Sequence, residues 1–271
     1  MNRIDALFSR LKGEGRKALM PFITAGDPDL ATTAALITAM VKHGAHMVEV
    51  GIPYSDPIAD GPVIAASYHR ALTSGVRLSH IFETLRTLRA ETYDGPVSVA
   101  PIVTMCSYAI IHRTGPESYL DKAAESGVDG LIVPDLPVEE AEALSKLATA
   151  RNLSLIQLVT PTTPRERILK IARSTTGFIY YVSVEGITGE RKAFPPELAR
   201  DVAWLREQTH LPICIGFGIS TPEHIRTLAP LADGLIVGSA LVRRLGEPDV
   251  RPKAMVDGIA KFVGELARAL D

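Results

Sequence analysis

The stretch that decides the fold is Met47–Pro62, which reads MVEVGIPYSDPIADGP. It begins as a short apolar, β-branched run that contains one carboxylate, Glu49. It then breaks at Gly51 into a loop with three prolines and two aspartates, Asp56 and Asp60. This pattern predicts a buried strand that leads into a rigid acidic loop. Because burying a lone carboxylate is costly, Glu49 is predicted either to be satisfied by a partner inside the fold or to act as a general acid or base at the strand end.

Similar apolar runs recur along the chain, with amphipathic helix-like segments between them. The eight runs lie at 18–25, 46–51, 96–103, 130–135, 154–160, 177–183, 212–218 and 233–239. A leading helix is expected at about 2–12 and a hydrophobic last helix at 254–269. Regular alternation of strand and helix predicts a parallel sheet, and continuous apolar strands without a second composition regime favour a closed barrel over an open sheet. The sequence therefore predicts the α/β class, with one TIM barrel, (β/α)8, spanning 1–271 and an extra N-terminal helix.

Several helix starts carry recognisable signals. Asp27-Pro28 is predicted to open the helix after the first strand, with Asp27 as its N-cap. Asp135, Thr163-Pro164 and Thr221-Pro222 precede three later helical segments. In a TIM barrel the chemistry lies where strands end and loops begin, at the C-terminal rim. We therefore expect the functional residues in the loops that follow the eight runs.

Composition narrows the class of partner. The chain has 271 residues, 46% hydrophobic and 22% charged, and a net charge of -2, so nothing in its overall charge favours nucleic acid or an anionic membrane. Cys106 and Cys214 lie far apart, which predicts two reduced thiols in a reducing compartment. The N-terminus lacks the apolar segment of a signal peptide, and no 18-residue apolar span occurs. We expect a soluble, cytoplasmic protein.

Glycine-rich turns follow the seventh and eighth runs, IGFGIS and VGSALVRRL. In TIM barrels these two loops commonly form a phosphate site with the N-terminus of a short helix. Gly216 and Gly218 let the backbone approach an anion, and Gly238 and Ser239 begin the short helix, where N–H groups favour phosphate. Either turn alone is also compatible with a simple exit from a strand. Together, at these positions, they predict a phosphate site.

The segment VEGITGERKAF, at 184–194, separates the sixth run from the next helix. Loops of this length inside a compact domain are usually lids or disordered. Thr188 and Gly189 are candidate lid contacts; the alternative is a passive surface loop.

Other chemistries lack their residues. None of the eight runs carries the lysine that an imine-forming aldolase needs. The closest metal-ligand spacing is His43, His46 and Glu49, whose expected positions cannot converge on one ion. A dinucleotide fingerprint after the first strand and a serine nucleophile elbow are also missing. Carboxylate acid/base chemistry on a small phosphorylated substrate remains, with no cofactor and no metal.

At this point the sequence resembles a known family, the tryptophan synthase alpha chains and their close relatives, the indole-3-glycerol-phosphate lyases. The resemblance runs nearly end to end. Its segments are PFITAGDPD (21–29), VEVGIPYSDPIADGPVI (48–64), PIVTM (101–105), GLIVPDLPVEEA (130–141), PTTPRERI (161–168), GFIYYVSVEGITGER (177–191), IGFGIS (215–220) and VGSALV (237–242). The family cleaves indole-3-glycerol phosphate to indole and glyceraldehyde 3-phosphate by a retro-aldol route.

The resemblance implies roles for the two carboxylates. Glu49 would take the proton from the glycerol hydroxyl and deliver one to indole C3, and Asp60 would accept the indole N–H bond and stabilise positive charge on that nitrogen. The alternative for Asp60 is an N-cap of the helix that begins at Pro62, and Asp56 is expected to make only a turn bond to the backbone.

The resemblance also implies binding residues. The family's phosphate contacts fall on Gly189, Gly218, Gly238 and Ser239, and its indole pocket falls on Phe22, Tyr180 and Phe217. An aromatic side chain at a strand end is otherwise ordinary core.

A beta chain is the partner that the resemblance implies, in an assembly of two alpha and two beta chains. In the loop facing that partner the family usually has an aromatic residue and an asparagine, where this chain has Ser107 and Ala109. This departure keeps open a stand-alone lyase that supplies indole to another pathway. A catalytically idle regulatory subunit is a further alternative, which intact Glu49 and Asp60 argue against.

Overall fold

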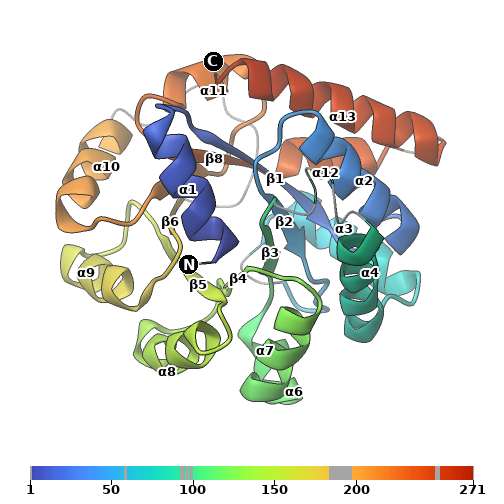
Figure 1. The fold of residues 1–271 in the computed structure, drawn as a ribbon, viewed down its shortest axis with the longest axis horizontal. Coiled ribbons are helices and arrows are strands. Elements are labelled where there is room, and N and C mark those ends of the chain that lie inside the picture. Colours follow the sequence, from blue (N-terminus) through green and yellow to red (C-terminus); the bar gives the residue numbers. More distant parts are fainter. Residues whose placement is uncertain are drawn as a thin grey trace.

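The computed structural model describes residues 2–57, 60–91, 95, 97, 100–182, 197–247 and 251–270. Eight parallel strands pair in chain order, and β8 closes on β1 (Figure 1). The strands are β1 Ala18–Thr24, β2 Val48–Gly51, β3 Ile102–Met105, β4 Gly130–Ile132, β5 Ser154–Val159, β6 Ile179–Val182, β7 Ile213–Gly216 and β8 Gly234–Val237. The predicted TIM barrel is confirmed.

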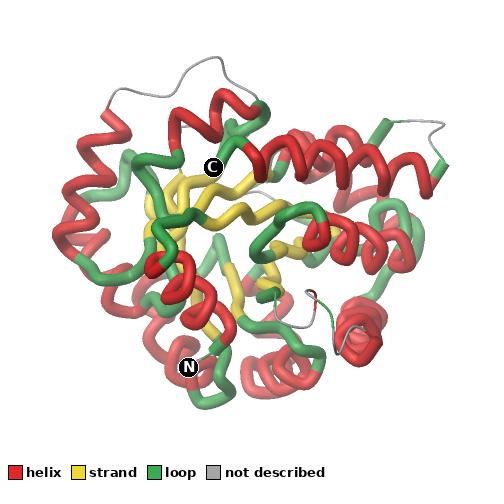
Figure 2. The backbone as a smooth tube through the Cα atoms, turned by 45° about the horizontal axis from the view of Figure 1, so that its top comes forward, coloured by secondary structure: helices red, strands yellow, loops and turns green. Residues whose placement is uncertain are grey.

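The helices pack around the outside of the strands, as Figure 2 shows. They are α1 Arg3–Gly13, α2 Leu30–Lys42, α3 Pro62–Thr73, α4 Leu78–Glu91, α6 Tyr108–Thr114, α7 Pro116–Glu125, α8 Val138–Thr149, α9 Arg165–Ser174, α10 Glu197–Gln208, α11 Pro222–Leu228, α12 Ser239–Leu245 and α13 Pro252–Arg268. The extra N-terminal helix α1 and the long last helix α13 match the two helices expected at the ends of the chain.

Helix α1 closes one end of the barrel. Its apolar face, which includes Ile4, Leu7 and Phe8, belongs to the same buried cluster as side chains from inside the barrel, such as Met20 and Ile156. The rings of Phe8 and Phe178, just before β6, lie 5.7 Å apart. In the described part of the chain α1 covers the N-terminal ends of the strands, which leaves the C-terminal ends as the entrance for a ligand.

The third predicted strand, 96–103, was placed too early. β3 begins at Ile102, and the described residues Val97 and Ala100 lie outside it. The carbonyl groups of Val97 and Ala100 instead accept hydrogen bonds from the guanidinium of Arg89, at 2.7 and 2.8 Å. Pro101 has no N–H to donate to a neighbouring strand. Arg89 on α4 therefore supplies the hydrogen bonds to backbone carbonyl groups that the apolar pattern had assigned to a strand.

The predicted N-cap of α2 was also wrong. Asp29, not Asp27, caps this helix, by accepting a hydrogen bond from the N–H of Thr32 at 2.6 Å. The carboxylate of Asp27 is turned to α3, where it pairs with both Nε and Nη2 of Arg70. A buried charge with an arginine partner in reach gains more from that pair than from a cap that the next aspartate can supply.

Both cysteines are free, as expected, and both are buried. Within the described residues, no helix is both long enough and apolar enough to span a lipid bilayer.

Candidate active site

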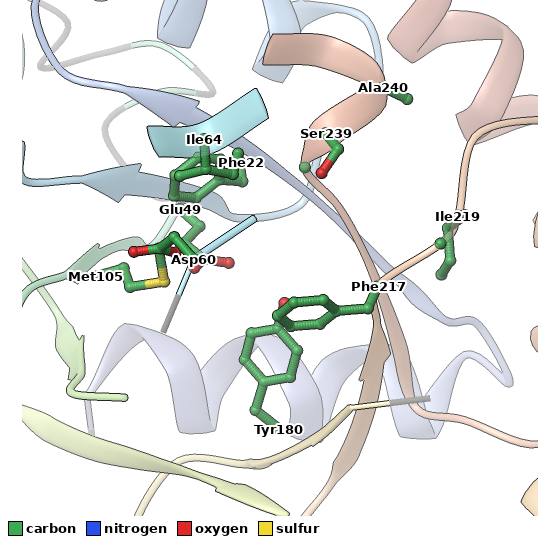
Figure 3. Close-up of a pocket in the computed structure, with 12 residues that line it drawn as sticks. Phe22, Glu49, Asp60, Ile64, Met105, Tyr180, Phe217, Ile219, Ser239 and Ala240 are labelled. Atoms are coloured by element: carbon green, nitrogen blue, oxygen red, sulfur yellow. The ribbon is translucent and has the colours of Figure 1, made fainter. Parts of the chain in front are cut away.

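The loops at the C-terminal ends of the strands surround a cavity with about 530 Å³ of empty space that is open to solvent. We call it the central cavity. Its lining is Phe22, Glu49, Asp60, Ile64, Met105, Tyr180, Phe217, Gly218, Ile219, Gly238, Ser239 and Ala240. Figure 3 shows the two carboxylates together on one side, near the rings of Tyr180 and Phe217, with Ser239 at the upper right. Residues as far apart in the chain as Phe22 and Ala240 thus meet in one place.

Glu49 lies in the middle of β2, where its neighbours in the sheet are Phe22 on β1 and Val103 on β3. Its side chain is only 3% exposed. Burial raises the pKa of Glu49 from 4.5 to about 8, and the negative charge of Asp60 adds to the shift. At neutral pH this carboxyl group therefore holds a proton that it can donate.

Asp60 precedes α3 and is partly exposed to the cavity. Burial raises its pKa from 3.8 to about 6, with a smaller contribution from the charge of Asp135. The N-cap of α3 is Gly61, with Pro62 in the first turn, so the alternative in which Asp60 caps this helix is wrong. At neutral pH an ionised Asp60 accompanies a protonated Glu49, and because the two interact they titrate as a pair.

The aromatic wall depends on an unusual backbone. Phe217 has a φ of 73°, a left-handed conformation that is rare for a bulky residue, and its ring centroid lies 5.9 Å from that of Tyr180. A side chain at Gly216 would place Cβ 2.5 Å from the Tyr180 ring. Gly216 therefore makes room for Tyr180 and does not line the central cavity, contrary to the expectation that it lies against an anion.

The two predicted glycine turns meet on one side of the cavity. Gly218, with a φ of 76°, and Gly238 both line it, and α12 begins at the next residue, Ser239. The first turn of a helix has N–H groups without intrahelical acceptors. Arg244 does not contribute, because its guanidinium lies 3.7 Å from the ring centroid of Phe262 on α13. The corner therefore offers backbone N–H groups and the Ser239 hydroxyl rather than the Arg244 guanidinium.

Sequence reasoning missed four lining residues, which are Ile64, Met105, Ile219 and Ala240. Met105 was lost because the third strand was predicted to end at residue 103. Ile64 lies in the first turn of α3, the helix that directly follows the acidic loop, and this position is the signal that could have found it. Two other predicted contacts, Thr188 and Gly189 of the expected lid, lie outside the described residues.

A second cavity, with about 520 Å³ of empty space, adjoins the first. We call it the side cavity. Its lining is Ile52, Tyr54, Asp56, Pro57, Asp60, Tyr68, Met105, Cys106, Ser107, Pro134 and Asp135. Asp60 and Met105 line both cavities and form the wall between them.

Comparison with known proteins identifies the family. The model of the family described as tryptophan synthase alpha chain matches residues 8–271. The chain belongs to the tryptophan synthase alpha chain family. The alpha chain of Rhodopirellula baltica is 56% identical over 98% of this chain and 95% of its own length. The alpha subunit of Legionella pneumophila, a solved structure, superimposes with a TM-score of 0.88 at 35% identity, covering 100% of this chain and 99% of that one.

A further similar structure was solved as part of a complex. A chain from the tryptophan synthase complex of Pyrococcus furiosus is 36% identical, with a TM-score of 0.82, and the match covers 93% of this chain and 98% of that chain. As a member of the tryptophan synthase alpha chain family, this protein is a lyase of tryptophan biosynthesis.

Proposed function

We propose that the chain cleaves indole-3-glycerol phosphate to indole and glyceraldehyde 3-phosphate, with Glu49 and Asp60 as its catalytic residues. The observation that supports these assignments is the central cavity itself, where both carboxylates lie near two aromatic rings and a corner of glycine backbone. Family membership supplies the reaction, and the lining supplies groups suited to each part of the substrate.

Glu49 handles both protons in this proposal. With a pKa of about 8 it is protonated at neutral pH and donates to indole C3, which converts the ring into the 3H-indolium ion with its positive charge on the nitrogen. The carboxylate that results then accepts the proton of the hydroxyl on the carbon attached to C3. As this hydroxyl becomes the aldehyde carbonyl, the carbon–carbon bond breaks and its electron pair returns to the ring. Glu49 ends the cycle protonated, as it began.

Asp60 stabilises the charge that develops on the substrate. Its pKa of about 6 leaves it ionised at neutral pH, so it accepts the indole N–H bond when C3 protonation places positive charge on the nitrogen. Because Asp60 lies in a partly water-excluded cavity, this interaction is stronger than it would be in bulk water.

The remaining contacts follow the shape of the cavity. Phe22, Tyr180 and Phe217 would hold the indole ring, and Gly218, Gly238 and Ser239 would bind the phosphate through backbone N–H groups and the serine hydroxyl. Gly189 would complete the phosphate site and Thr188 the lid. These assignments follow the family resemblance and, for the described residues, their place in the central cavity.

We also propose a tryptophan synthase beta chain as the partner, in an assembly of two alpha and two beta chains. The loop at Ser107 and Ala109 is a candidate contact. Ser107 caps α6, and its hydroxyl donates to the carboxylate of Asp135 at 2.7 Å. Ser107 and Ala109 thus belong to a turn held by hydrogen bonds, which supports an interface whose side-chain contacts differ from those of the family.

The decisive experiment measures indole release by the purified chain, alone and with a beta chain added. We expect slow release by the chain alone and a large stimulation by the partner. Release at ordinary enzymatic speed without the partner would favour a stand-alone lyase, and no release under either condition would contradict the proposed reaction.

A substitution tests the role of Glu49. In Glu49→Gln the isosteric amide cannot transfer the proton, so we expect indole release to fall by at least about 10³-fold, within the range for a positioned acid/base. Binding of glycerol 3-phosphate, measured by calorimetry, should change less than about threefold. Glu207→Gln, at an exposed position on α10, serves as the control. Wild-type activity in Glu49→Gln would support an idle regulatory subunit instead.

A further inference from the structure

Tyr68 lies on α3, one helical turn after Ile64, and is only 3% exposed. A Cβ added at Gly51 would lie 2.9 Å from Oη of Tyr68. The hydroxyl is therefore fixed against the end of β2, two residues beyond Glu49, and it lines the side cavity together with Asp60.

Tyr68 lines the side cavity, and burial together with the charge of Asp60 raises the pKa of its hydroxyl, so the hydroxyl stays protonated and can donate. The side cavity can supply the partner, because a water needs about 30 Å³ and two to four polar neighbours. Asp60, Asp135 and the Ser107 hydroxyl provide such neighbours.

We infer that Tyr68 is a positioning residue for Asp60. Its hydroxyl donates to a water bound in the side cavity, and that water donates to the Asp60 carboxylate from the side opposite the central cavity. One oxygen of Asp60 is thereby held in place while the other remains available to the substrate. The inference rests on the catalytic role proposed for Asp60.

The charged and titratable groups around Asp60 determine whether loss of the Tyr68 hydroxyl raises or lowers the pKa of Asp60. The charge of Asp135 after β4 disfavours a negative charge on Asp60, and Asp56 in the loop after β2 lines the same cavity. Glu49 on β2 is protonated near the pKa of Asp60. Among the described residues, the other titratable groups near Asp60 are Tyr68 on α3, Tyr180 on β6 and Cys106 after β3. Burial raises the pKa of each of these three groups, so all three are neutral at neutral pH. A hydrogen bond donated from Tyr68 through water favours the ionised carboxylate and opposes the repulsion. Loss of the Tyr68 hydroxyl should therefore raise the pKa of Asp60.

The experiment compares Tyr68→Phe with the wild-type chain and with Tyr119→Phe as a matched control. Tyr119 is also a fully buried tyrosine, and its hydroxyl has no partner, but it lines neither cavity. The titration of Asp60 is followed by NMR of the ¹³C-labelled aspartate carboxyl groups in the substrate-free protein. We expect the pKa of Asp60 to rise by about 0.5–1 unit in Tyr68→Phe, an energy of about 1 kcal/mol, and to stay unchanged in Tyr119→Phe.

Kinetics supply the second readout. The acidic limb of kcat/KM should move upward by the same amount in Tyr68→Phe, which gives a three- to tenfold loss at pH 5.5 and less than twofold at pH 8. An unchanged Asp60 titration in Tyr68→Phe, or an equal shift in Tyr119→Phe, would overturn the inference. The NMR titration needs no substrate, so a wild-type chain that releases no indole would contradict the proposed function without deciding this result.

Discussion

Glu49 illustrates how function works against stability at the scale of one residue. A carboxyl group buried to this degree resists ionisation, which keeps a proton available for transfer at neutral pH. The unfolded chain has no such resistance, because there the same group is hydrated and ionises near pH 4.5. Ionisation of the unfolded state therefore lowers the free energy of unfolding throughout the pH range between these two values.

The pH dependence of stability should reveal this cost. Because the pKa of Glu49 is raised by folding, its contribution to stability is complete below about pH 4.5 and is lost as the pH rises to about 8. The loss is about 1.4 kcal/mol for each pH unit in that window. Glu49→Gln, which cannot ionise, should therefore be more stable than the wild type above pH 5, by a few kcal/mol at pH 8.

Urea unfolding of both proteins between pH 4.5 and 9 measures this difference. The gain of Glu49→Gln should grow up to about pH 8 and then level off. A constant difference across the range, or a less stable variant at pH 8, would mean that Glu49 is ionised in the folded protein at neutral pH.

Helix α3 is the element that carries the site's acidic side. Asp60 immediately precedes it, Ile64 lines the central cavity from it, and two polar contacts fix it to the end of β1. Oγ1 of Thr24 lies 2.6 Å from Oγ of Ser67, and Arg70 pairs with Asp27. The hydrogen bond of Ser67 and the ion pair of Arg70 therefore hold the helix that directly follows Asp60.

Breaking the Arg70 contact should loosen this attachment. In Arg70→Leu the carboxylate of Asp27, which is 1% exposed, would be left buried without a counter-charge. Removing one partner of a fully buried pair costs about 3–5 kcal/mol, and because Arg70 is 40% exposed we expect about 2 kcal/mol. Urea unfolding measures the loss.

Arg86→Leu is the matched control on the neighbouring helix α4. Arg86 pairs with Glu83, but both side chains are about 60% exposed, so little stability should be lost. Equal losses in the two variants would show that the burial of Asp27 has no energetic consequence.

At the scale of the whole molecule, the barrel separates stability from chemistry. The active-site loops occupy one end, and a network centred on Asp129 occupies the other. The Asp129 carboxylate accepts hydrogen bonds from Arg3 on α1, Arg89 on α4 and the N–H of Ile102 on β3, each at 2.8 Å. One buried carboxylate thus joins the helix that closes the barrel to two other elements.

Asp129→Asn should therefore destabilise the fold without altering the chemistry. The charge of Arg89, which is 10% exposed, would lose its buried partner, and we expect a loss of about 3 kcal/mol in urea unfolding. Indole release per folded molecule at 20 °C should remain within about twofold of the wild type. Asp121→Asn, at an exposed pair with Arg151, should change neither quantity. A large loss of activity in folded Asp129→Asn would contradict the separation of the two ends.

The sequence alone determined the fold class and seven of the eight strand positions, and it singled out Glu49 and Asp60, two carboxylates that line one cavity. Strand periodicity and the oddity of a carboxylate in an apolar run are local features, so they can be read without knowing any distant neighbour. The same holds for the glycine turns, whose place after the last two strands follows from the order of the elements.

Only the tertiary structure decided what each side chain meets. Asp27 was predicted to cap a helix, yet Arg70 lies 43 residues away and reaches it across the barrel rim. Gly216 was assigned to an anion, yet the ring that occupies its side-chain space comes from β6. Met105 and Tyr68 reach their cavities through the packing of β3 and α3. Contacts between distant residues depend on register and packing, which local sequence patterns do not encode.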